Sequence, residues 1–267
     1  MLGLASNISK ESEGYPQYRT RTSCTFAART DDRIEVSNHA DLQVNGSDFS
    51  FSGWAKFIID ASSGDGETGY AIIEAGVYGT SGNGNGRGFY IYYLDNAGDN
   101  EHFQFYTNNE SETSTTLNGD NLTHDIWYHV VGKNTVLSSG QWYHVVGTYD
   151  HSATTSRLYV NGSEVSAGAK TDMVEPAEYT GTIKIGGSDT NSISAKECEI
   201  IFWKGTVLSP TQVAGLYNNG RPRHGLSCER DTIKGWWKLN ANDDTGSNNV
   251  IDSSGNGRHG TTSGLAS

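Results

Sequence analysis

The stretch from Gln141 to Gly162, which reads QWYHVVGTYDHSATTSRLYVNG, constrains the fold of this chain more than any other part of the sequence. Aromatic and β-branched residues alternate in its first half, as in a β-strand, where successive side chains point to opposite faces. The polar residues 150–156 predict a loop, and residues 157–160 return as a second strand. Asn161-Gly162 then allows a further reversal, because both residues tolerate positive φ angles. We expect the two faces of the first strand to carry Trp142, His144, Val146 and Thr148 on one side and Tyr143, Val145 and Tyr149 on the other.

The rest of the chain has the composition of a protein built from many short strands. It contains 33 glycines, only 4 prolines, and 6 Trp, 14 Tyr and 8 Phe residues, whose large rings can fill a core. Further alternating runs occur at residues 34–36, 49–54, 89–93 and 102–107. The sequence therefore predicts an all-β fold, a single antiparallel β-sandwich.

The sequence WYHVVGTYD at 142–150, followed by LYVNG at 158–162, resembles the laminin-G-like, concanavalin A-like jelly-roll family. An FSGWAK strand at 51–56, preceded by a D-D turn and an I-E-V strand, also looks like this family. The resemblance covers roughly residues 24–220. It implies a two-layer antiparallel β-sandwich of the concanavalin A-like jelly-roll type.

One short helix is expected near residues 209–219. Ser209 can cap it, Pro210 suits the first helical position, and Gln212 completes an S-x-x-Q capping box. Gly220 is expected to end it. A short helix after a strand is also what the family resemblance implies.

The chain divides into three parts by pattern. Residues 1–22 are interpreted as an N-terminal arm, residues 23–220 as the jelly-roll domain, and residues 221–267 as a segment that completes or extends the same sandwich. This last part holds GWWKLN and DSSGNGRHGTT, which usually open the domain in cellular members of the family but close it here. The order resembles laminin-G-like proteins carried by tailed bacteriophages, especially marine ones.

The hexapeptide WYHVVG occurs twice, beginning at Trp127 and at Trp142. The second copy continues into the family motif, so we assign it to the family's strand. The first copy is either its hairpin partner, turning around residues 133–140, or a local duplication that lengthens a loop.

Charge and composition argue against several functions. The net charge of −12 gives a surface that repels phosphate backbones, so nucleic acid is not an expected partner. No apolar run reaches the ~18 residues of a membrane span, and the first residues do not read as a signal peptide. The three cysteines, Cys24, Cys198 and Cys228, are widely spaced and predict free thiols.

Catalysis is not expected. Retaining glycosidases need two carboxylates about 5 Å apart. The nearest candidates are Glu197 and Glu199, which would share a strand face at positions i and i+2, although Ile201 at the next position of that face is apolar. No zinc motif or G-x-S-x-G nucleophile sequence occurs.

Calcium is the metal that the acidic loops favour, because it prefers several oxygen ligands from flexible loops. Two weaker candidate clusters are Asp65 with Glu67 and Asp95 with Asp99. The preferred calcium site consists of Asp243, Asp244, Asp252 and Asn256.

Aromatic residues suggest two kinds of contact. An aromatic platform for carbohydrate would consist of Tyr70, Tyr78, Tyr90 and Tyr92, which flank the glycine-rich loops. Adjacent Trp236 and Trp237 face opposite sides of a strand, so one should enter the core and the other should meet the arm, a loop or another subunit. Tyr15 and Tyr18 in the arm are further candidate assembly contacts.

These observations favour a non-enzymatic bacteriophage protein of the virion surface, such as a capsid decoration or fibre-like component. Its expected partners are other virion proteins and further copies of itself, with a trimer among the symmetries considered. The alternative is a calcium-assisted lectin module that binds host-surface glycans. A glycoside hydrolase is the third interpretation.

Overall fold

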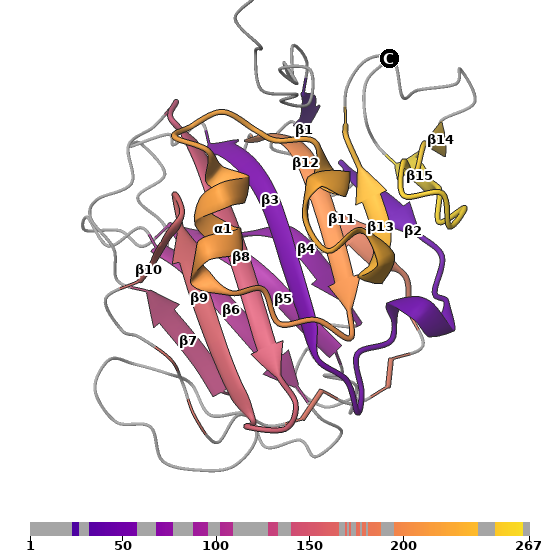
Figure 1. Ribbon diagram of the computed structural model, residues 1–267. Helices are drawn as coiled ribbons and strands as arrows, with labels where there is room; N and C mark the ends of the chain where they lie inside the picture. The colour runs from indigo at the N-terminus through magenta and orange to yellow at the C-terminus, as the bar shows by residue number, and fades with distance from the viewer. Residues whose placement is uncertain are drawn as a thin grey trace, which may run out of the picture.

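The computed structural model describes residues 23–26, 32–57, 68–76, 88–95, 102–108, 128–132, 140–165, 169, 171, 175–176, 178–179, 181–187, 195–239 and 249–263. These residues form two antiparallel sheets stacked face to face, with one α-helix on the outer side of one sheet (Figure 1). The predicted two-layer β-sandwich is therefore confirmed.

The first sheet has seven strands among the described residues. In spatial order they are β1 (Cys24–Phe26), β12 (Ala195–Lys204), β3 (Phe49–Phe57), β8 (Trp142–Asp150), β9 (Thr155–Val160) and β10 (Ser163–Glu164), and β13 (Ile233–Trp237) also pairs with β12.

The second sheet has eight strands within the same part of the chain. Their spatial order is β14 (Asn249–Val250), β15 (Gly260–Ser263), β2 (Arg33–Val36), β11 (Ile183–Ile185), β4 (Thr68–Ala75), β5 (Gly88–Asp95), β6 (His102–Asn108) and β7 (Tyr128–Gly132). Three short 3-10 helices, η1 (Ala40–Leu42), η2 (Gly225–Ser227) and η3 (Arg230–Thr232), connect described strands.

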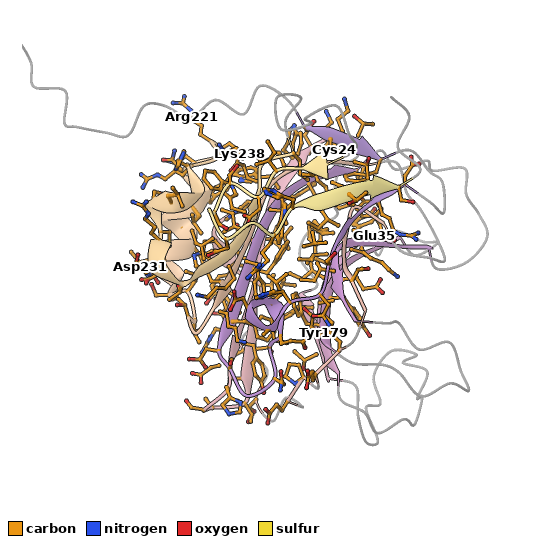
Figure 2. All side chains as sticks on the ribbon, turned by 90° about the vertical axis from the view of Figure 1, so that its right-hand side faces the viewer. Cys24, Glu35, Tyr179, Arg221, Asp231 and Lys238 are labelled. Atoms are coloured by element: carbon orange, nitrogen blue, oxygen red, sulfur yellow. The ribbon has the colours of Figure 1, made fainter. Side chains whose placement is uncertain are left out.

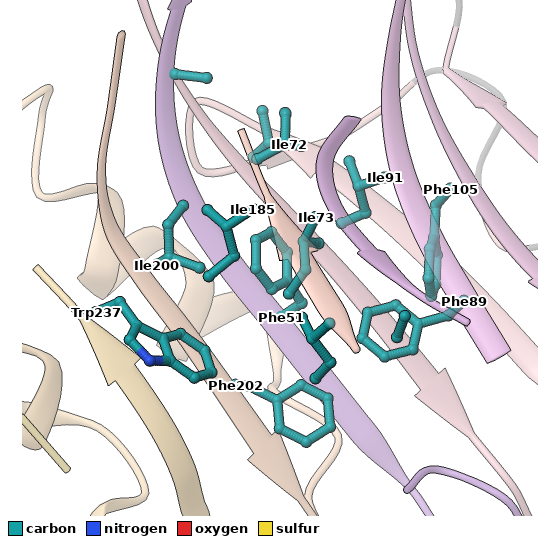
Figure 3. Packing of buried hydrophobic residues seen from close by; sticks show 14 of the residues in the cluster. Phe51, Ile72, Ile73, Phe89, Ile91, Phe105, Ile185, Ile200, Phe202 and Trp237 are labelled. Carbon is teal, nitrogen blue, oxygen red and sulfur yellow. The ribbon is translucent and has the colours of Figure 1, made fainter. Parts of the chain in front are cut away.

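The core lies between the sheets and is built largely from aromatic rings (Figure 3). Phe57 of β3 and Tyr93 of β5 stack with ring centroids 4.2 Å apart, and Phe202 of β12 stacks on Phe89 of β5 at 5.7 Å. Such pairs stabilise a core beyond the area that they bury. A Cβ at Gly147 would come within 3.0 Å of an isoleucine of β5, so the glycine allows the sheets to approach closely there.

The two predicted faces of β8 are confirmed. Val145 and Tyr149 belong to the core between the sheets, whereas Val146 packs in a second apolar cluster on the outer side. Of the two alternatives for the repeated hexapeptide, the hairpin is wrong. The first copy, β7, pairs with β6 at the edge of the eight-stranded sheet, while the second copy is β8, between β3 and β9. Both copies form strands because the same alternation of side chains between two faces suits a strand in either sheet.

A bulge in β12 changes which residues of this strand face the core. Glu197 lies on the core side before the bulge, and Ile200 and Phe202 do so after it. Glu199 is the additional residue, with a φ angle of 55°, and its N–H donates to the carbonyl oxygen of Lys238 at 3.2 Å. The inward positions therefore shift from odd to even numbers along the strand.

Helix α1 (Pro210–Tyr217) covers part of the outer face of the seven-stranded sheet (Figure 1). Its predicted capping box is confirmed, because Ser209 Oγ accepts from the Gln212 N–H and Gln212 Oε1 accepts from the Ser209 N–H. The helix ends at Tyr217, and its C-cap residue, Asn218, has a left-handed conformation. Its buried side chains join the outer apolar cluster, which contains Val146, Tyr159, Ile201, Trp203, Leu208, Val213, Leu216, Cys228, Ile233 and Trp236.

A neutral histidine lies beneath the end of this helix. The ring of Tyr217 stacks on Trp54 at 5.8 Å, and the His144 ring lies 5.0 Å from Trp54. His144 Nε2 is hydrogen-bonded to Ser52 Oγ at 2.8 Å. Burial lowers the pKa of His144 to about 3, so the imidazole is uncharged at neutral pH.

The C-terminal segment contributes strands to both sheets, since β13 pairs with β12 and β15 pairs with β2. The buried carboxylate of Asp252 holds this segment together. Its Oδ1 accepts from the N–H groups of Trp236 and Ser254, and its Oδ2 accepts from that of Arg258, each at 2.9 Å. Asp252 thus joins the GWWKLN motif to the DSSGNGRHG motif.

All three cysteines are free, as predicted. None of the helices in the described part of the chain has the length and apolarity to cross a bilayer.

We expect the Asp252→Ala variant to lose about 2–3 kcal/mol of unfolding free energy, because three N–H groups lose a charged acceptor. Urea denaturation followed by tryptophan fluorescence measures this loss. Ser253→Ala is the matched control and should stay within about 0.5 kcal/mol of the parent protein. An unchanged denaturation midpoint for Asp252→Ala would contradict the role assigned to this carboxylate.

We also expect protein stability to depend on the protonation of His144. Its folded-state pKa lies below its ordinary value of 6.5, so its contribution is complete above that pH and is lost as the pH falls towards 3. Between pH 7 and pH 5 this loss should reach about 2 kcal/mol. The His144→Gln variant should lack that component of the pH dependence, whereas His151→Gln, at a partly exposed histidine, should keep it. Equal slopes for His144→Gln and the parent protein would contradict the prediction.

Candidate functional site

The outer face of the seven-stranded sheet carries a row of solvent-accessible side chains at one end of its strands. This row consists of Thr25, Lys196, Lys56 and Trp142, which lie on β1, β12, β3 and β8. Each is the Cα partner of the next, and directly opposed residues of antiparallel strands bring their Cβ atoms to within about 5 Å. The four side chains therefore form a continuous strip, which we call the outer row.

The direction of these side chains follows from their neighbours. Ala55 and Phe57 flank Lys56 in β3, and both are buried in the core between the sheets. Lys196 in β12 precedes Glu197, which is on the core side. Because successive side chains in a strand alternate, both lysines point outward.

Trp142 gives the outer row an apolar surface. Its side chain is 37% exposed, and no other large hydrophobic residue in the described part of the chain is exposed. The stem of Lys56 runs past the start of β8, since a Cβ at Gly140 would lie 4.0 Å from Lys56 Cε. The row thus combines an exposed indole with a lysine on the neighbouring strand.

The outer row borders on the cluster beneath α1. Trp54 lies two residues before Lys56 in β3, and His144 lies two residues after Trp142 in β8. They are 4% and 1% exposed. Tyr217 stacks over both rings, at 5.8 Å and 6.2 Å. The helix end therefore covers the neighbouring positions and the exposed surface begins at Lys56 and Trp142.

The predicted tyrosine platform does not assemble as expected. Tyr70 is fully buried and contacts Phe57 and Phe26 edge-on, and Tyr90 is only 3% exposed. Neither ring can stack on a sugar in this conformation, because each is already packed inside the protein. Tyr78 and the side chain of Tyr92 lie outside the described residues.

The preferred calcium site contains two residues that already have other roles. The Asp252 carboxylate accepts three backbone N–H groups, and Asn256 Nδ2 donates to the carbonyl oxygen of Ile233 at 2.9 Å. Asp243 and Asp244, together with Asp65, Glu67 and Asp99, lie outside the described part, as does the side chain of Asp95. Within the described part, no group of three or more His, Cys, Asp or Glu side chains could hold a metal. Calcium binding stays a prediction.

The expectation that Glu197 and Glu199 share a strand face is wrong. The bulge separates them: Glu197 points between the sheets, and Glu199 Oε2 accepts from Trp236 Nε1 at 2.9 Å on the outer side. Burial raises the pKa of the Glu197 carboxyl well above its usual range, and the nearby Tyr70 hydroxyl opposes part of that change. Neither Glu197 oxygen has a hydrogen-bond partner among the described residues, so burial of the charged form is not compensated there.

Trp236 and Trp237 face opposite sides, as predicted, but both are buried, at 1% and 0% exposure. Trp237 enters the core between the sheets, and Trp236 packs in the outer cluster beside His224 at 4.5 Å. Neither side chain can form a subunit contact from this position. Tyr15 and Tyr18 lie outside the described residues.

Sequence reasoning assigned no binding role to the outer row. The alternation in β8 places Trp142 on the same face as the buried His144, but it carries no signal that only the first of the two is exposed. Lys56 and Lys196 are 140 positions apart in the chain, and only the pairing of β3 with β12 brings them together.

Comparisons with known proteins agree with this architecture. Residues 132–214 match the Laminin_G_3 family model, described as "Concanavalin A-like lectin/glucanases superfamily". No curated protein matches the sequence significantly.

Two solved structures share the fold at low sequence identity. One is a "putative carbohydrate binding protein" from Bacteroides ovatus ATCC 8483, which is 17% identical with a TM-score of 0.55, the match covering 92% of this chain and 59% of that one. Another is the ligand binding domain of botulinum neurotoxin serotype D in complex with N-acetylneuraminic acid, at 16% identity and a TM-score of 0.52, covering 74% of this chain and 42% of that one. This chain thus spans less than two thirds of either protein. Residues 132–214 are thus similar to the concanavalin A-like lectin/glucanases superfamily, and the two solved structures show the same fold over most of the chain.

Proposed function

We propose that this protein is a non-enzymatic carbohydrate-binding module that holds a glycan against Trp142 on the outer row. The exposed indole is the observation that carries the proposal. Sugar rings have apolar C–H faces that pack on flat aromatic surfaces, while their hydroxyl groups need polar neighbours. The outer row offers both, because Thr25 and two lysines follow the indole across the sheet.

The sheet gives this surface rigidity. Trp142 begins a nine-residue strand that pairs with β3 and β9, and its neighbour in the row, Lys56, lies near the end of another nine-residue strand. Side chains on regular strands keep their spacing better than side chains on loops, so little ordering is required when a ligand binds. The structural likenesses to proteins described as binding carbohydrate or N-acetylneuraminic acid support the same function.

The non-enzymatic part of the proposal rests on the two candidate carboxylates. A glycosidase places its two carboxyl groups on either side of one scissile bond, in a cleft that admits the sugar. Glu197 is 0% exposed between the sheets, and Glu199 is 2% exposed beneath Trp236. A sugar cannot reach both groups, because a layer of β-sheet separates them.

The virion role remains a prediction from sequence resemblance. None of the proteins compared above is described as a virion component, and assembly with virion proteins or into a homo-oligomer has no structural observation behind it. We favour glycan binding over the virion role because the protein has an exposed surface whose chemistry suits a sugar. A carbohydrate-binding module can also belong to a virion surface, so the two functions are compatible.

We expect Trp142→Ala to weaken glycan binding by about tenfold or more, since an aromatic anchor at the centre of a contact typically carries that much affinity. An array of neutral and acidic oligosaccharides identifies the ligand, and isothermal titration calorimetry then measures the affinity. Trp142→Phe should retain most of it, and Gln141→Ala, at an exposed neighbour, should retain all of it. Thermal unfolding should be nearly unchanged in each variant. A parent protein that binds no glycan on the array would overturn the proposed function.

We expect Glu197→Gln to unfold at a higher denaturant concentration than the parent protein at neutral pH. The raised folded-state pKa means that the contribution of Glu197 is complete below its ordinary pKa of 4.5 and is lost as the pH rises towards the folded-state value. Glutamine removes this cost because it never ionises. Denaturation curves at acidic and neutral pH measure the difference, and glycan affinity should not change. A reduced affinity in this variant would point to a role for Glu197 that the structure does not explain.

A further inference from the structure

We propose that the outer row is selective for acidic glycans, that is, sugar chains that carry carboxylate or sulfate groups. This inference rests on the proposed function and adds the chemical class of the ligand. It follows from the charges around Trp142 rather than from the indole itself.

Among the described residues, neither ammonium group of the outer row pairs with a carboxylate. Lys56 and Lys196 are directly opposed in neighbouring strands and both are partly exposed. No ion pair in the described part of the chain includes either of them. Like charges directly opposite each other in a sheet repel, so an anion bound between them relieves an existing repulsion.

The two carboxylates that follow Lys196 in the sequence are withdrawn from this surface. Lys196 is followed by Glu197 inside the core, and Glu199 turns beneath Trp236 because of the bulge. In the sequence K-E-C-E at 196–199, the lysine is therefore partly exposed and both glutamates are buried. This arrangement is unusual for a chain with a net charge of −12, whose average surface would repel an acidic polymer.

Further basic residues lie at the same end of the molecule. Figure 2 shows Arg221 and Lys238 at the end where Cys24 lies. Cys24 is the Cα partner of Glu197, so this is also the end of β12 that carries Lys196. Arg221 is exposed and follows Tyr217, whose ring covers Trp54 next to the outer row. A polymer that extends beyond Trp142 would therefore meet more positive charge.

The geometry suits one saccharide unit with an anionic substituent. The indole of Trp142 would pack against the C–H face of the sugar ring. Lys56, the adjacent residue in the row, would contact the carboxylate or sulfate, with Lys196 one strand further on. An ammonium group acts as a compact point charge, so it accepts either anion without a fixed bidentate geometry.

The test compares oligosaccharide pairs that differ only in the anionic group: sialyllactose against lactose, and sulfated against unsulfated galactan oligosaccharides. Calorimetry on the full chain should show about tenfold tighter binding of the acidic member at low salt, and the difference should shrink as the salt concentration rises. Lys56→Gln and Lys196→Gln should each weaken acidic binding by about threefold, and the double variant by about tenfold. Binding of the neutral member should stay the same in all three.

Lys234→Gln is the matched control, because it removes the same charge from β13, away from the row and near Asp41. It should bind every glycan as the parent protein does. Equal affinity for both members of each pair, with binding still lost in Trp142→Ala, would overturn the selectivity and leave the proposed function standing. Absence of binding to all four oligosaccharides and to the array would overturn both.

Discussion

The bulge at Glu199 in β12 determines which side of the sheet each residue of that strand meets. It lets Ile200 and Phe202 enter the core while Ile201 and Trp203 pack under the C-terminal segment. It also turns Glu197 inward and leaves Lys196 outside, beside Lys56. Without the additional residue, the pattern after the bulge would require Lys196 in the core, where an ammonium group would lose its hydration. The candidate binding surface therefore depends on a backbone irregularity that also serves core packing.

Coverage of the outer face determines where a ligand can bind. Helix α1 and the segment around β13 bury most of the outward side chains of the seven-stranded sheet in the second apolar cluster. Tyr217, the last residue of the helix, stacks over Trp54 and His144 on the same face. Trp142 lies just beyond it and keeps an exposed ring. On this face of β8, His144 is buried, whereas Trp142, two residues before it, is exposed.

Local pattern was a good guide to the elements and a poor guide to the site. The alternation in β8, the capping box at Ser209 and the opposite directions of Trp236 and Trp237 could all be predicted, since each depends on residues close together in sequence. The tyrosine platform failed because Tyr70 and Tyr90 are packed inside the protein. Asp252 was predicted to bind calcium, but its carboxylate already accepts hydrogen bonds from three N–H groups. Burial and hydrogen-bond partners are properties of the assembled fold, which neighbouring residues do not report.

The sequence by itself determined the sandwich, the short helix that begins after Ser209 and the inward and outward faces of β8, because strand periodicity and end-capping are local. The tertiary structure alone decided that two copies of WYHVVG lie in different sheets, that Glu197 and Glu199 point apart, and that Lys196, Lys56 and Trp142 stand in one row. The physical reason is that strand register joins residues far apart in the chain. One additional residue in a strand reverses every side chain beyond it, and here that residue, Glu199, donates its N–H to the carbonyl oxygen of Lys238, which is distant in sequence.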